Sequence, residues 1–415
     1  PRTPCVGALY VIVSDTRFYG KIDFSACTIG FKSSAAPVLF SLPSLFKHLH
    51  FKYTQSQCHL SQHHSMARGE LQPLRRSLAW RLSSSVVMGL TGAISRAFLY
   101  GLNDVQTEGL KPFLKLLDER QGVSRRQGLI TGYACPIHGY FVLTKSPRLD
   151  DPVTWGVLPL KYAFKPRNLR WGLGAHDICF KNKFMSTFFS LGQVLPTHRL
   201  LHSPHGGLFQ PTMNEAVRVL SGEATSPPYG ASGPTFTTKA GEVFPAPSAY
   251  DEERNAWVHV FPEACVHQHP ELSLRYFKWG VSRMILESNP APKFVPMFID
   301  GHHLIMHENR GKPRWLPRVG RKVRVVFGDA VDVDQVFGEF RKRWRHLVEE
   351  HQVRIEKSGK PLAPEALEGL EEAIHLRKKV AELVRSQVAR LRTASGYPED
   401  DPSFALSDRS VLGEG

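Results

Sequence analysis

The chain has 415 residues, 42% of them hydrophobic, and its formal net charge is +15 with an isoelectric point of about 9.6. This length fits one large domain or two smaller ones, and the apolar content is sufficient for an extensive core. The positive charge predicts an anionic partner. Because the sequence has no zinc-finger spacing, aromatic nucleic-acid motif or Lys/Arg block, we expect phospholipid head groups and no nucleic acid.

The amino-terminal segment, residues 1–82, is basic and rich in serine. It has ten Lys or Arg against three Asp or Glu, shows no sustained periodicity, and contains a strand-like patch at residues 8–13. We expect a poorly ordered leader, or upstream sequence included through an error in the gene model, with Met66 as an alternative start. The six cysteines of the whole chain lie far apart, which predicts free thiols rather than disulfides.

Residues 83–102 are the best candidate for a membrane-associated helix. The run is apolar except for Arg96, and a charge at the centre of a membrane span costs about 2.5–3.5 kcal/mol. Three glycines further weaken a free helix. We therefore expect a helix that lies in the membrane interface or re-enters it, with Arg96 reaching lipid phosphates. A buried core helix is the alternative.

From residue 103 to residue 330, strand and helix signals alternate, which predicts an α/β domain. A short strand is expected at residues 128–131 and a final one at residues 322–327. Residues 202–250 are rich in Ser, Pro and Gly, and we expect them to form a long mobile surface loop.

Two carboxy-terminal helices are predicted within residues 331–395. They cover about residues 334–357 and 364–394, and the second has an apolar stripe of helical period that we expect to dock on the α/β domain. The polar tail at residues 396–415 is expected to be disordered.

One segment, residues 257–283, is more informative about function than the rest. An apolar run from Trp257 ends at Pro262 and presents a single acid, Glu263. Such a run is typical of a buried parallel strand whose carboxyl end delivers a side chain to a crevice. The basic and aromatic residues at 274–280 suit anionic head groups or acyl chains. An ordinary strand with a solvated acid at its end is the plainer interpretation.

This segment resembles the Phe-Pro-Glu block of the glycerophospholipid acyltransferase family, with Phe261, Pro262 and Glu263 as substrate-binding residues. A second block, residues 192–199, resembles the family's glycine turn followed by a phosphate-binding arginine, here Gly192 and Arg199. By this resemblance Arg199 and Glu263 hold the glycerophosphate and Gly192 shapes the pocket. The family has glycine where this chain has Ala264, so a positive φ at that position would be strained.

The family's first block supplies its catalytic base, a histidine five residues before an aspartate. That aspartate is present as Asp150, followed by Asp151 and Pro152, but Lys145 stands where the histidine belongs. Lysine is a poor base near neutral pH. Three explanations remain open: a gene-model error that removed the histidine, a genuine loss of catalysis, or the use of His138 from the longer preceding loop.

The resemblance, which covers about residues 78–395, implies a glycerolipid acyltransferase-type fold: a mixed, twisted sheet flanked by helices. It implies acyl transfer from a phospholipid to a lysophospholipid, above all to monolysocardiolipin, giving cardiolipin, without metal or bound cofactor. It also implies a place on the mitochondrial outer and inner membranes, facing the intermembrane space. A catalytically inactive lipid-binding protein of the same fold is the alternative.

Overall fold

The computed structural model describes the strands at 8–13, 16–23, 28–33 and 36–41, and residues 74–120, 128–134, 151–221, 233–250, 255–264, 271–305, 316–356 and 364–402. The chain divides into two units, residues 1–71 and 72–415. The first unit is an antiparallel meander of four strands, which falls within the segment where a poorly ordered leader is expected: β1 (Ala8–Val13), β2 (Thr16–Asp23), β3 (Thr28–Ser33) and β4 (Ala36–Ser41).

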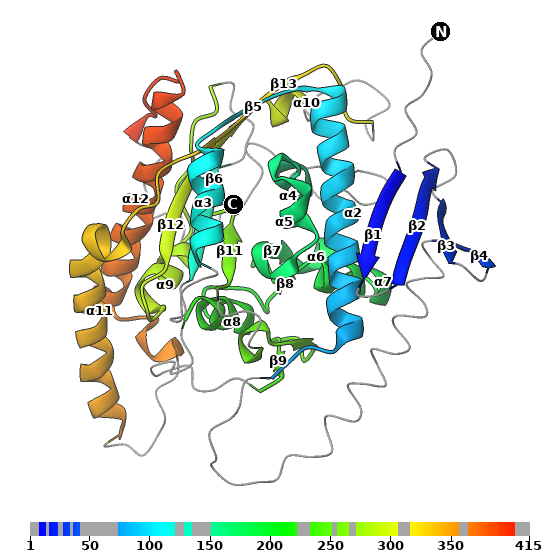
Figure 1. Ribbon diagram of the computed structural model, residues 1–415. Coiled ribbons are helices and arrows are strands. Elements are labelled where there is room, and N and C mark those ends of the chain that lie inside the picture. The colour runs from blue at the N-terminus through cyan, green and yellow to red at the C-terminus, as the bar shows by residue number, and fades with distance from the viewer. Residues whose placement is uncertain are drawn as a thin grey trace, which may run out of the picture. The chain divides into compact units, whose positions relative to one another are not determined.

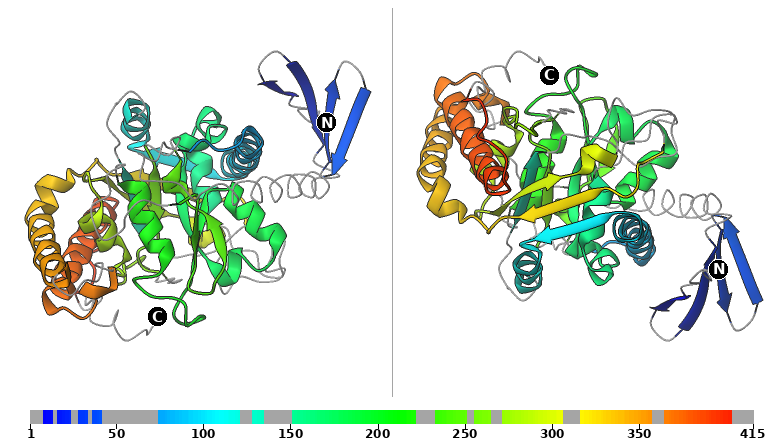
Figure 2. Two further views of the ribbon diagram at one scale, coloured as in Figure 1. Left: turned by 90° about the horizontal axis from the view of Figure 1, so that it is seen from below. Right: turned by 90° about the horizontal axis from the view of Figure 1, so that it is seen from above.

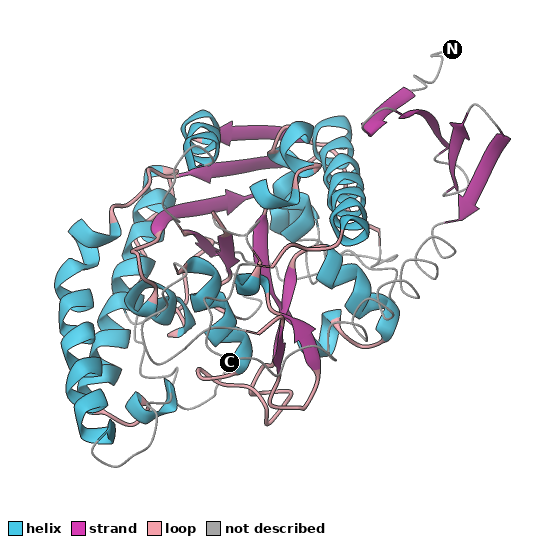
Figure 3. Cartoon of the chain, turned by 60° about the horizontal axis from the view of Figure 1, so that its bottom comes forward, coloured by secondary structure: helices cyan, strands magenta, loops and turns pink. Residues whose placement is uncertain are grey.

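The second unit is built on a mixed sheet of seven strands in the order β5-β13-β12-β6-β11-β7-β8 (Figures 1 and 3). The five strands from β12 to β8 are parallel, whereas β13 pairs antiparallel with β12 and parallel with β5. The strands are β5 (Asp104–Glu108), β6 (Leu129–Ala134), β7 (Arg170–Ala175), β8 (Val194–Thr197), β11 (Trp257–Val260), β12 (Lys293–Asp300) and β13 (Lys322–Phe327). This architecture confirms the predicted α/β class.

Helices cover both faces of the sheet (Figure 2). On one face lie α2 (Leu78–Leu102), α3 (Leu110–Glu119), α4 (Asp151–Thr154), the 3-10 turn η2 (Trp155–Val157) and α5 (Leu160–Ala163). On the other lie α8 (Pro211–Leu220), α9 (Gly280–Glu287), α11 (Val333–Glu356) and α12 (Glu371–Ala394). Strand β11 is buried on both sides. Trp257 packs in the core between the sheet and the helices α2 to α5, and Val258 and Val260 pack in the core between the sheet and α8, α9, α11 and α12. Because both faces of such a strand are buried, its sequence is a nearly continuous apolar run.

Helix α2 begins at Leu78, earlier than the expected residue 83. The hydroxyl of Ser77 caps it by accepting a hydrogen bond from the backbone N–H of Trp80 at 3.3 Å. Gly89 lets α2 approach α5, because a Cβ there would lie 2.2 Å from the ring of Phe164. Within the described residues, α2 is the one helix long and apolar enough to cross a membrane by length and composition.

Arg96 on α2 does not reach outward as expected. Its Nη1 donates hydrogen bonds to the carbonyls of Gly156, Val157 and Leu158 at 3.2–3.3 Å, and its guanidinium lies over the ring of Tyr100. Three clustered carbonyl acceptors hold Nη1 of Arg96 against the domain, so this arrangement does not support the expected contact with lipid phosphates, which stays a prediction.

The stretch 202–250 also differs from the expected loop. It contains α8 and a small hairpin of β9 (Thr235–Thr237) and β10 (Val243–Pro245). Helix α8 starts at Pro211, where the absent N–H of proline is no loss, and it packs its apolar face on α9 and β11. The proline and serine content concealed this helix, since proline is as much a helix-start signal as a loop signal.

Candidate active site

The carboxyl ends of β6, β11, β7 and β8 lie next to one another at one edge of the sheet, because these four strands are adjacent and parallel. In open α/β sheets, ligands bind in the crevice at this edge. The segment after β11 presents Phe261, Pro262 and Glu263, and the segments after β7 and β8 present two histidines and an ion pair. The edge therefore has two sides, one after β11 and one after β7 and β8.

On the first side, the chain after β11 forms a tight turn. The backbone N–H of Ala264 donates to the carbonyl of Phe261 at 3.0 Å, and the N–H of Lys278 donates to the carbonyl of Pro262 at 2.7 Å. Ala264 has a φ of 54°, a left-handed conformation that costs a residue with a Cβ about 1–2 kcal/mol. The backbone at Ala264 therefore has the positive φ that makes alanine strained, and glycine would suit this position better.

Glu263 is held inside the protein, with 4% of its surface exposed. One carboxylate oxygen accepts the backbone N–H of Arg275 at 3.2 Å. Burial raises the pKa of Glu263 to about 8, although this N–H and the charges of Arg275 and Arg385 lower it in part. At neutral pH the carboxyl is therefore largely protonated, and it can donate a hydrogen bond as well as accept one.

Two arginines of α12 fix the segment that carries this amide. Arg385 donates to the carbonyl of Leu274 at 2.6 Å and to the carboxylate of Asp400 at 2.8 Å. Arg392 donates to the carbonyl of Leu272 at 2.9 Å and lies 3.1 Å from Asp400. The carboxy-terminal helix thus positions the partner of the buried acid, a role that its apolar stripe did not predict.

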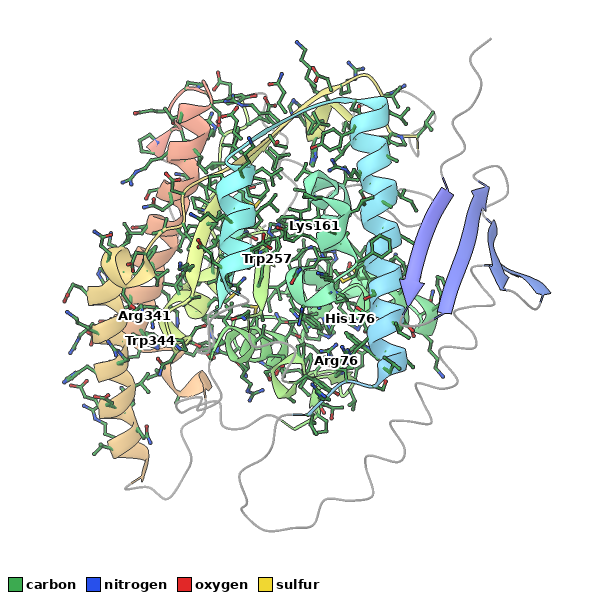
Figure 4. All side chains as sticks on the ribbon, in the orientation of Figure 1. Arg76, Lys161, His176, Trp257, Arg341 and Trp344 are labelled. Carbon is green, nitrogen blue, oxygen red and sulfur yellow. The ribbon has the colours of Figure 1, made fainter. Side chains whose placement is uncertain are left out.

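A buried polar cluster lies within β11 and β6, starting two residues before Phe261. The Nδ1 of His259 lies 2.8 Å from the hydroxyl of Thr131, which also accepts the indole N–H of Trp257 at 2.7 Å. The rings of Trp155 and Phe261 meet His259 edge to face, and Trp257 lies beneath α3 (Figure 4). Sequence reasoning missed this cluster, whose signal was a histidine within an apolar run.

On the second side, two histidines stand at the ends of β7 and β8. His176 follows β7 as the first residue of α6 (His176–Cys179), and His198 follows β8. Since Ala175 pairs with Thr197, the two imidazoles stack with ring centroids 4.1 Å apart. Burial, and then the neighbouring His176, lower the pKa of His198.

The next residue in each loop forms an ion pair. Arg199 donates from Nε and Nη2 to both carboxylate oxygens of Asp177, at 3.1 and 2.6 Å. Both side chains remain about one-third exposed and line a cavity of about 350 Å³ together with both histidines. Arg199, expected to bind phosphate, is therefore near the edge but already has a bidentate anionic partner.

The structure separates the other expected residues from this edge or does not describe them. Gly192 ends α7 (Lys183–Leu191) and precedes β8, so it lies at the amino end of the strand, opposite Arg199. Its φ of −80° does not require glycine. His138 and Asp150 lie outside the described residues, between the end of β6 and the start of α4.

Comparison with known proteins identifies the family. No protein-family model matches the chain. It is 35% identical to Tafazzin from Saccharomyces cerevisiae over 338 residues, which are 80% of this chain and 83% of the yeast protein. It is 28% identical to a protein named Taffazin from Dictyostelium discoideum, over 62% and 72% of the two chains. It is also 29% identical to N-acylphosphatidylethanolamine synthase from Arabidopsis thaliana, over 45% and 53%. The chain therefore belongs to the tafazzin family of phospholipid acyltransferases.

Proposed function

We propose that this protein transfers an acyl chain from a phospholipid to monolysocardiolipin, and so remodels cardiolipin on mitochondrial membranes. The observation that supports this most is the adjacency of β6 and β11. Strand β6 ends at Ala134, next to the end of β11 that carries Glu263, and His138 and Asp150 follow Ala134 in the sequence, outside the described residues. A base and a glycerophosphate-binding acid on neighbouring strand ends suit acyl transfer at one crevice.

In the proposed reaction a base removes the proton from the lysolipid hydroxyl, whose oxygen attacks the donor's ester carbonyl. The tetrahedral intermediate then expels the donor's glycerol oxygen, which takes the proton from the base, so that no other reactant is consumed. Asp150 orients the base. Protonated Glu263 donates a hydrogen bond to the glycerophosphate, and Arg199 exchanges Asp177 for phosphate.

Contact with the membrane is assigned to the outer face of α2. In its first half, exposed apolar residues recur at intervals of four and share one face of the helix: Leu78, Leu82 and Val86. The opposite face is docked, with Ser84 donating to the carbonyl of Leu191 at 2.7 Å. An amphipathic helix held in this way suits a membrane interface better than a span, and the net charge of +15 suits anionic lipid.

A lipid-binding protein without catalysis is the second candidate, because Lys145 stands at the position of the family's histidine. In this candidate Glu263 and Arg199 still hold the glycerophosphate, and no acyl chain moves. The two candidates differ only in the loop between β6 and α4.

The deciding experiment incubates the purified full chain with liposomes that contain monolysocardiolipin and phosphatidylcholine, followed by mass spectrometry of cardiolipin. Transfer that His138→Ala abolishes and Lys145→Gln leaves intact supports catalysis by the chain as written. Binding of cardiolipin liposomes without transfer supports the second candidate. Sequencing the transcript across residues 129–152 completes the test, since a message with histidine five codons before Asp150 restores the family's base.

A further inference from the structure

In the part of the chain that the structure describes, three ligand atoms converge beside the Arg199–Asp177 ion pair. They are the Nε2 atoms of His176 and His198 and a carboxylate oxygen of Glu242, all within 4.8 Å of one another. We infer that these three residues form a zinc-binding site. These residues share a cavity with Arg199, but zinc binding there does not depend on the acyl-transfer chemistry proposed above.

Three separate segments bring these ligands together. The paired ends of β7 and β8 supply His176 and His198, and the turn between β9 and β10 supplies Glu242. The backbone N–H of Thr238 donates to the carbonyl of Glu242 at 2.8 Å and closes that turn. Because no two of the ligands are close in sequence, their spacing gave no metal signal.

The distances suit a small tetrahedral ion. Nε2 of His176 lies 2.7 Å and Nε2 of His198 lies 3.8 Å from Oε2 of Glu242. Ligand atoms about 2.0–2.2 Å from a tetrahedral zinc ion lie roughly 3.3–3.6 Å from each other. Both separations from Glu242 differ from this range by less than about 1 Å, so we expect side-chain rotations rather than a rearrangement of the fold to bring the ligands to bonding distance.

The ligand atoms are also buried without hydrogen bonds. Nε2 of His176, Nε2 of His198 and Oε2 of Glu242 are all inaccessible to solvent and have no hydrogen-bond partner among the described residues. The short contact between His176 and Glu242 is thus poorly aligned for a hydrogen bond. A buried polar atom without a partner costs about 1–3 kcal/mol, and a shared cation offsets this cost for all three at once.

Surrounding groups complete the arrangement. The hydroxyl of Ser203 lies 3.2 Å from Nδ1 of His198 and can accept a hydrogen bond from it, which would leave Nε2 to face the cation. The cavity of about 350 Å³ adjoins the cluster and supplies space for a water molecule as fourth ligand. Two histidines, one carboxylate and a water molecule form a ligand set that zinc commonly takes.

The test is a calorimetric titration of the detergent-purified full chain with zinc chloride after removal of metals by a chelator. We expect one saturable site, whose affinity falls at least about tenfold in Glu242→Gln and in His176→Ala. His202→Gln, a histidine that lines the same cavity but is not a ligand, is the matched control and should bind as the parent does. X-ray absorption at the zinc edge should show two imidazoles.

Thermal unfolding gives an independent readout that does not depend on activity. Zinc should raise the melting temperature of the parent and of His202→Gln, but not of Glu242→Gln. The inference is overturned if zinc binds without saturation, or if the two ligand variants bind it as tightly as the parent. It is equally overturned if zinc leaves the melting temperature of the parent unchanged, since the cluster is then a plain His–Glu ion pair.

Discussion

The two sides of the carboxyl edge are built from neighbouring loops but differ in how their charged groups are held. After β11, Glu263 is enclosed, largely protonated at neutral pH, and bonded to a backbone amide that α12 fixes. After β7 and β8, Arg199 and Asp177 pair at the wall of an open cavity. The motif that identifies the family thus lies on the closed side, whereas the more accessible chemistry lies on the open side.

The difference teaches that a motif residue can owe its properties to distant parts of the chain. The pKa of Glu263 depends on burial, and the amide it accepts is positioned by Arg385 and Asp400, far along the sequence. On the open side, the ion pair depends only on two loops that the register of β7 and β8 brings together. Changes on the closed side should therefore alter stability more than changes on the open side.

The largest effect is expected from Arg385→Met. This change removes a buried cation from Asp400 and from the carbonyls of Leu274 and Arg275, and it should lower the free energy of unfolding by roughly 3–5 kcal/mol. Denaturant unfolding followed by circular dichroism measures the loss. Lys379→Met, at an exposed site on the same helix, should stay within about 0.5 kcal/mol of the parent. Equal losses in both variants would mean that α12 does not clamp the closed side.

Glu263→Gln tests the protonation of the buried acid. Because the folded-state pKa of about 8 exceeds the ordinary value of 4.5, the unfolded chain releases its proton first, and the parent loses stability as pH rises between these values. Glutamine cannot ionise. The free energy of unfolding of the variant, relative to the parent, should therefore rise by about 4 kcal/mol from about pH 5 to about pH 9. Unfolding curves at both pH values measure this gain.

Glu339→Gln, at an exposed position, serves as the control and should show no such trend with pH. A parallel pH dependence in Glu263→Gln and the parent would show that Glu263 ionises normally in the fold.

Much of the fold could be predicted from local patterns. The strand at residues 322–327 agrees with β13, and the apolar run from Trp257 is β11, because a strand buried on both faces needs side chains that are nearly all apolar. Helix α8 was missed because the Ser, Pro and Gly content of residues 202–250 was taken to indicate a loop. Once the parallel strands were known, the order of the strands in the sheet determined which carboxyl ends lie next to one another.

Less of the candidate site could be predicted, because its properties arise from contacts between distant segments. The loop that follows β11 was placed at the carboxyl edge as expected, but nothing in the local sequence indicated the bidentate pairing of Arg199 with Asp177. Nor could spacing show that Gly192 lies at the opposite end of β8. The convergence of His176, His198 and Glu242 required the pairing of three separate segments.

A smaller effect is expected from Ala264→Gly, which restores the family's residue in the turn of the closed side. Glycine removes the cost of a Cβ at a φ of 54°, while it adds conformational entropy to the unfolded chain. The net result should be a gain in stability of about 0.5–1 kcal/mol. Gly338→Ala, the reverse exchange on exposed α11, is a useful reference because a Cβ there meets no neighbouring atom. A loss of stability in Ala264→Gly would mean that the turn relaxes to a negative φ in solution.

The smallest effect on stability is expected on the open side, from Asp177→Asn. The Arg199–Asp177 pair is about one-third exposed, so breaking it should cost less than about 1 kcal/mol. Although burial alone would raise the pKa of Asp177, the Arg199 bonds hold it below its usual value, and this stabilisation is therefore lost as pH falls through that lowered pKa.

The effect of Asp177→Asn on function should be larger than its effect on stability, because Arg199 no longer has to leave a carboxylate before it binds phosphate. Binding of anionic liposomes at low salt should tighten, and the gain should vanish in Asp177→Asn combined with Arg199→Gln. Glu119→Gln, which breaks the exposed pair with Lys115, should change neither quantity. If Asp177→Asn weakens liposome binding instead, Asp177 holds Arg199 in its binding position rather than competing with phosphate for it, and the two sides of the edge are then both fixed by internal partners.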